Sequence, residues 1–265
     1  MELKDYTVTN LREPGFQKIS KKSIDAMRSS LLLSTEQIYS SLYENVSKRA
    51  QEIFTCPEFQ QIVTNILINY AETEIREILN RPPKIRIVSI TAFNCLYPNR
   101  QQIINPLTFG WISDQTHETA TFNINSKFIH CSSEDTCLKM ESFLVISMIH
   151  LMCHFVNNTL QKRNGEDVVS NDHCRLIKKV NCQLYGASLL PFTDACLNNY
   201  EIRGFILRYS PFDEERLVDN SFLDTLMNGS IADLRKKAKI YKCDITRMPH
   251  LDMITVFPDC KFCSA

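Results

Sequence analysis

Apolar residues recur at helical spacing in the N-terminal part of the chain. Ser34 and Gln37 form a capping-box pattern, which predicts the start of a helix. The apolar positions that follow at helical spacing are Ile38, Leu42, Val46 and Ile53. A second helix is predicted from Pro57 to the Pro82-Pro83 pair, because proline is favoured in a first helical turn and disfavours helix in the residue before it.

The centre of the chain changes from helical to alternating periodicity. Residues 84–90 and 118–125 carry β-branched and aromatic residues at alternate positions, which predicts two strands, and a short third strand is expected at 109–112. Residues 138–160 are apolar over most of their length and are predicted to form a buried helix. The pattern therefore predicts a helix-rich α+β fold with a small sheet around residues 84–125.

The C-terminal half is predicted to be helical. A capped helix is expected over residues 171–186, and another over residues 193–208. Shorter helices are expected over 214–227 and 231–241.

Composition excludes some classes of function. The formal net charge is zero, so nothing draws the whole chain to nucleic acid or to a membrane surface. Only six glycines are present, and no glycine-rich phosphate loop occurs. The N-terminus has no apolar signal segment, and the longest apolar run is too short to cross a bilayer, so we expect an intracellular protein, nuclear or cytoplasmic, without a membrane partner. Eleven scattered cysteines are then expected to be reduced thiols.

Two histidines lie in the apolar segment FLVISMIHLMCHFV, residues 143–156. His150 and His154 are four positions apart, about 400° of helix, so both imidazoles lie on nearly the same face. Zinc hydrolases with an H-E-x-x-H motif place two metal ligands in this way. His173, after a loop, could complete a set of three nitrogen ligands for zinc. The alternative is a pair that only hydrogen-bonds to its neighbours in a buried helix.

Residues 84–186 resemble the zincin fold, and most nearly the SprT/Spartan-type metalloprotease domain. That family has a helix with H-E-x-x-H, a loop, and a second helix that opens with the third histidine. The first two family histidines fall on His150 and His154 in MIHLMCHFVNN, and the third falls on His173 in NDHCRLIKKVN. The resemblance implies a zinc site at these three residues and a protein associated with DNA in the nucleus.

The chain departs from the family pattern at the catalytic glutamate. Leu151 occupies that position and cannot take a proton from zinc-bound water, and loss of a general base typically costs roughly 10²–10⁴-fold in rate. Cys174 replaces the glycine that usually follows the third histidine. Glu118, Glu141 and Glu166 are candidate substitutes for the base, although nothing in the sequence places them near the metal. Two alternatives remain: a vestigial or structural zinc site, or a fold kept without metal, which the missing glutamate favours.

A second candidate zinc site lies at the C-terminus. Cys243, His250, Cys260 and Cys263 form a C-x6-H-x9-C-x2-C set, and four such ligands suit a tetrahedral structural zinc. SprT-like proteins often carry a zinc ribbon after the protease-like domain, which this tail resembles in shortened form. The alternative is a frayed terminus with unpaired thiols.

A basic cluster precedes this tail. Its residues are Arg235, Lys236, Lys237, Lys239 and Lys242. Such a cluster can bind phosphates of a nucleic acid, or it can simply be a solvated helix face. A protein partner is also expected, because the helices of residues 34–82 carry more apolar residues than one packing face needs.

The chain is thus divided into four parts. These are an N-terminal arm (1–33), an N-terminal helical segment (34–82), a zincin-like domain (83–210) and a C-terminal helical tail (211–265). Three functions are considered: an inactive metalloprotease-like protein that binds or scaffolds partners, a working zinc hydrolase with a displaced base, and a helical adaptor unrelated to zincins. The missing glutamate favours the first.

Overall fold

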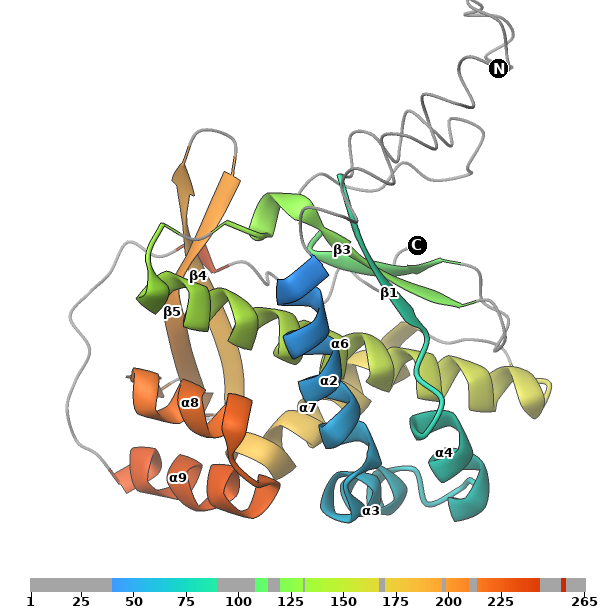
Figure 1. The fold of residues 1–265 in the computed structure, drawn as a ribbon. Coiled ribbons are helices and arrows are strands. Elements are labelled where there is room, and N and C mark those ends of the chain that lie inside the picture. The colour runs from blue at the N-terminus through green and yellow to red at the C-terminus, as the bar shows by residue number, and fades with distance from the viewer. Residues whose placement is uncertain are drawn as a thin grey trace, which may run out of the picture. The chain divides into compact units, whose positions relative to one another are not determined.

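The computed structural model describes eight stretches of the chain (Figure 1). They are residues 40–89, 108–113, 120–130, 132–166, 170–196, 199–209, 214–243 and 254–255. The chain divides into two compact units, Met1–Ile38 and Tyr39–Ala265, and all described residues lie in the second unit. The start of the predicted first helix, at Ser34, lies outside them.

Three helices form the first part of the described unit. They are α2 (Ser40–Thr55), α3 (Pro57–Ile66) and α4 (Glu72–Leu79). Cys56 caps α3 and Pro57 stands at its first position, as the sequence predicts. The predicted second helix is, however, two helices: the backbone leaves the helical conformation at Leu67, and the turn that follows exposes Ile68. The chain thereby reverses, so that α3 packs against α4.

The predicted central sheet is present. It contains β1 (Lys84–Val88), β2 (Gly110–Ser113) and β3 (Thr121–Asn125) in the order β1-β3-β2. Strand β1 is parallel to β3, whereas β2 is antiparallel to it. Phe122 and Ile124 of β3 are buried, which is why the alternating pattern identified this strand.

Helix α6 (Glu134–Arg163) is the core of the unit, and the short 3-10 turn η2 (Ser126–Phe128) precedes it. Ser133 and Thr136 form a capping box at its start. Figure 1 shows α2 crossing α6, and α6 also packs against α4, α7 (Ser170–Tyr185) and β2. By length and composition α6 could cross a membrane, but 89% of its most apolar window is buried within the protein, as is typical of a core helix.

A second sheet, which the sequence pattern did not predict, covers another part of α6. It contains β4 (Ser188–Cys196), β5 (Asn199–Tyr209), β6 (Glu214–Leu217) and β7 (Ile254–Thr255) in the antiparallel order β6-β5-β4-β7. The prediction of a helix over 193–208 is therefore wrong. Residues 204–207 are buried side by side without alternation, and the ring of Phe192 lies directly over Gly204, an arrangement of paired strands.

Two helices complete the described chain. Asp219 caps α8 (Asn220–Asn228), and α9 (Ile231–Cys243) packs against α7 and α8. The predicted helix over 214–227 thus begins with a strand, β6. The helix-rich α+β class with a small sheet around residues 84–125 is confirmed.

Candidate histidine site on the central helix

His150 and His154 project from the same side of α6. Their ring centroids are 6.4 Å apart and the ring planes differ by only 19°. His154 is buried, whereas His150 is half-buried. The four-residue spacing on a regular helix produces this arrangement.

The β2 edge of the central sheet lies over the histidine-bearing turn. The ring of Phe109, just before β2, meets the His150 ring edge-on at a centroid distance of 6.3 Å. Gly110 comes so close to α6 that a Cβ atom there would lie 3.3 Å from Cδ1 of Leu151. Leu151 is therefore packed beneath β2, with 1% of its surface exposed.

Burial also sets the charge state of the half-buried histidine. It lowers the pKa of His150 from 6.5 to about 4, because desolvation disfavours the imidazolium form. The ring is thus neutral at pH 7, which is the form that binds metal ions.

The spacing of the two rings is compatible with two ligands of one zinc ion. A zinc–nitrogen distance of about 2.0 Å and a tetrahedral angle put ligand ring centroids roughly 5 Å apart. The observed 6.4 Å is wider by about 1 Å, a difference that side-chain rotation can close. The pair therefore fits two of the positions around a zinc ion.

The structure brings the third predicted ligand onto a neighbouring helix but does not describe its side chain. His173 lies in the first turn of α7, and α7 packs against α6. Within the described ranges, no group of three or more histidine, cysteine, aspartate or glutamate side chains is close enough to hold a metal ion.

Two of the three glutamates that the sequence offers as a general base are described, and they do not reach the histidines. Glu141 is nine residues before His150 on α6, so it lies on the opposite face and about 13 Å away along the axis. Glu166 is exposed beyond the end of α6, where it accepts a hydrogen bond of 2.9 Å from the Tyr70 hydroxyl. Glu118 lies outside the described residues. Neither Glu141 nor Glu166 therefore lies beside Leu151.

The C-terminal candidate zinc site falls almost wholly outside the described residues. Cys243 is the last residue of α9, and its side chain is not described. His250, Cys260 and Cys263 lie beyond it, in parts of the chain that the structure does not describe.

The basic cluster lies on α9, and its members differ in exposure and in their hydrogen bonds. Arg235, Lys236 and Lys239 are exposed. Lys237 instead donates hydrogen bonds to the main-chain oxygen of Ser221, at 2.5 Å, and to Oγ1 of Thr225, at 3.2 Å. It therefore fastens α9 to α8. The side chain of Lys242 is not described.

The cysteines differ from the prediction at one position. Cys56, Cys153 and Cys182 are free thiols, whereas Cys137, near the start of α6, is disulfide-bonded. The expectation that the thiols are reduced is wrong for Cys137. The spacing of single cysteines along the chain does not reveal which of them meet in the fold.

Comparison of the chain with protein-family models, with curated proteins and with solved structures finds no match.

Proposed function

We propose that this chain is a catalytically inactive, zincin-like protein that acts as a binding or scaffolding module. The observation that carries the proposal is the packing of Leu151, the residue after His150, beneath β2. Its side chain fills the space beneath Gly110 of β2, where the resemblance to SprT-type proteases requires a carboxylate.

The position of Leu151 argues against a zinc hydrolase with a displaced base. A general base has to lie within hydrogen-bond reach, about 2.6–3.2 Å, of the water whose proton it takes. Leu151 has no accepting atom, and the described alternatives, Glu141 and Glu166, lie on the far side of α6 or beyond its end. What remains is an apolar turn with two imidazoles that can bind a metal ion, and neither of these two glutamates lies beside it to act as the base.

The histidines can still serve a metal. His150 and His154 fit two zinc positions by their spacing, and the proposal assigns the third to His173. Zinc bound there would supply Lewis-acid chemistry, while the residues of this chain would only hold and orient it. The proposed partner is a protein, with or without bound DNA. The exposed members of the basic cluster on α9 can contact phosphates of that DNA; they are Arg235, Lys236 and Lys239.

Zinc content measured on the purified chain tests the metal part of the proposal. We expect His150→Ala to lower the zinc content by one ion per chain, while His130→Ala, a half-buried histidine outside the pair, leaves it unchanged. Counting the difference between variants removes any contribution from the C-terminal cysteines. Equal zinc content in the parent and the folded His150→Ala variant would reject this metal site.

A gain-of-function pair tests the missing base. Leu151→Glu restores a proton acceptor, whereas Leu151→Gln has similar size and polarity but no basic carboxylate. We expect zinc-dependent cleavage of an unfolded polypeptide by the folded Leu151→Glu variant only. Equal inactivity of both variants, in folded and zinc-loaded form, would contradict the idea that only the base is missing.

A further inference from the structure

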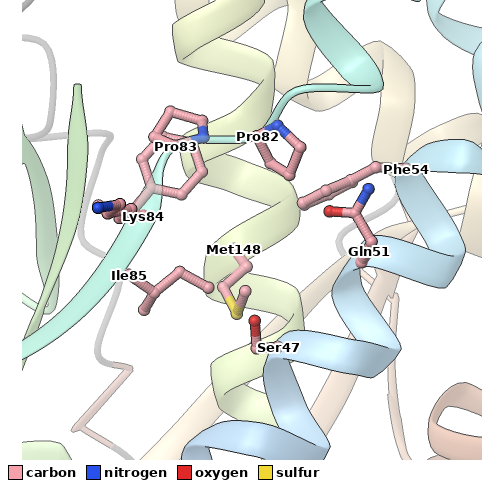
Figure 2. A pocket seen from close by; sticks show the side chains of 9 residues that line it. Ser47, Gln51, Phe54, Pro82, Pro83, Lys84, Ile85 and Met148 are labelled. Atoms are coloured by element: carbon pink, nitrogen blue, oxygen red, sulfur yellow. The ribbon is translucent and has the colours of Figure 1, made fainter. Parts of the chain in front are cut away.

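A pocket of about 190 Å³ opens between α2 and the start of β1, with α6 as its floor (Figure 2). It lies away from the histidines, because Met148 in its floor is two residues, or about 200° of helix, from His150. The pocket is therefore separate from the proposed histidine site.

Six of the nine described residues that line the pocket are apolar. They are Phe54, Pro82, Pro83, Ile85, Phe122 and Met148. Two successive prolines offer no main-chain N–H group to a ligand. A cavity of about 150 Å³ with walls of this kind accommodates benzene, so the volume is sufficient for one ring or branched aliphatic group.

Two polar side chains of α2 lie at the pocket, one helical turn apart. Figure 2 shows Ser47 and Gln51 directed toward the space between α2 and β1. Both are half-buried, and neither side chain forms a hydrogen bond with another described residue. A half-buried hydroxyl and carboxamide gain from a partner that can both donate and accept.

The charges around the pocket indicate whether a ligand should be ionised or neutral. Among the described residues of the lining, Lys84 alone is charged, and it is exposed. Successive residues of a strand point to opposite faces, so Ile85 faces the pocket while the Lys84 ammonium points away from Gln51 and Met148, as Figure 2 shows. An ionised ligand would lose hydration in the pocket without gaining a counter-ion.

We propose that this pocket binds an uncharged small ligand that carries one benzene-sized apolar group and an amide-like edge. The apolar group lies between Met148, Phe54 and the proline pair. The amide edge pairs with the carboxamide of Gln51 and the hydroxyl of Ser47. Affinity for a ligand of this size is in the millimolar range.

Benzamide is the probe, and its binding to the full chain is measured by a saturation-transfer NMR titration. Acetamide, which lacks the ring, and benzoate, which carries a charge, are the comparison ligands. We expect saturable binding of benzamide alone. Binding of benzoate as tight as that of benzamide, or no saturable binding of benzamide, would overturn the proposal.

Variants locate the site. Ser47→Phe fills the pocket from a half-buried position and is expected to abolish binding. Gln51→Ala removes one hydrogen-bonding group and is expected to weaken binding about fivefold, the equivalent of one ordinary hydrogen bond. Gln61→Ala is the matched control, because Gln61 is an exposed glutamine of α3 that does not line the pocket and donates a hydrogen bond to Asn65. Should Ser47→Phe fail to fold, the comparison of Gln51→Ala with Gln61→Ala decides, and equal affinities in those two variants would refute the site.

Discussion

Replacing Arg49 with methionine removes the contact by which α2 holds the end of α8. Its Nε donates to the main-chain oxygen of Leu226 at 2.8 Å, and its Nη2 donates to that of Gly229 at 2.5 Å. Carbonyl groups at a helix C-terminus have no partner within the helix, so a cation there satisfies them and favours the helix dipole. Arg49 thus joins two segments that are 177 residues apart.

The size of the effect follows from these two bonds. A hydrogen bond to a charged group contributes about 1.5–3 kcal/mol. Methionine keeps the apolar stem, so the loss is confined to the guanidinium, whose side chain is 13% exposed. The ion pair with Glu52 adds little, because the carboxylate is about half exposed. We expect Arg49→Met to lower the free energy of unfolding by about 3–6 kcal/mol, the sum for the two bonds, and Arg49→Lys, which cannot form both bonds, by less.

Urea unfolding, followed by circular dichroism, measures the difference. Arg81→Met is the control, because Arg81 is exposed and its closest ion-pair distance, to Glu77, is 3.8 Å. We expect the control to change the free energy of unfolding by less than about 0.5 kcal/mol. If Arg49→Met and Arg81→Met were equally stable, the docking of α2 on α8 through these carbonyls would be refuted.

Three further predictions concern other parts of the structure. Gly110→Ala should destabilise the protein by about 1–3 kcal/mol in urea unfolding, because its Cβ atom would lie 2.9 Å from a main-chain oxygen of β3, whereas unchanged stability would rule out this close approach. Hydrogen bonds from Ser132 hold the pKa of Glu201 below 4.5, so the ionised carboxylate stabilises the folded protein. Glu201→Gln should therefore lower the free energy of unfolding most near neutral pH, and this difference from the parent should shrink as the pH falls through the folded-state pKa. A difference that grows on acidification would contradict this. Burial raises the pKa of the Cys153 thiol to about 12, whereas Cys182 is exposed. Mass spectrometry after iodoacetamide treatment of the native protein should therefore find Cys182 modified before Cys153. Equally fast modification of the two thiols would be inconsistent with the burial of Cys153.

The sequence identifies elements whose residue pattern is set over a few neighbouring positions. The long apolar run of α6, the alternation of apolar and polar residues in β3, and the common face of His150 and His154 are found in this way. Strand β5 is missed because its centre is buried on both sides, which removes the alternation that distinguishes a strand from a helix.

The surroundings of the histidine pair depend on contacts that periodicity does not encode. Gly110 approaches Leu151 across 41 positions of chain, and only the antiparallel pairing of β2 with β3 brings them together. The pocket likewise joins α2, β1 and α6, so Ser47 and Gln51, which line it, look like ordinary surface residues of an amphipathic helix in the sequence. The identity of Leu151, in contrast, is visible in the sequence, and it follows from chemistry alone that a leucine side chain cannot accept a proton.

Cleavage of an unfolded polypeptide by the purified parent chain with added zinc is the decisive measurement. With Leu151 packed beneath β2, we predict no cleavage above that of the His150→Ala variant. Cleavage by the parent that His150→Ala abolishes would show a working hydrolase with a base elsewhere, and would contradict the assignment of an inactive binding module.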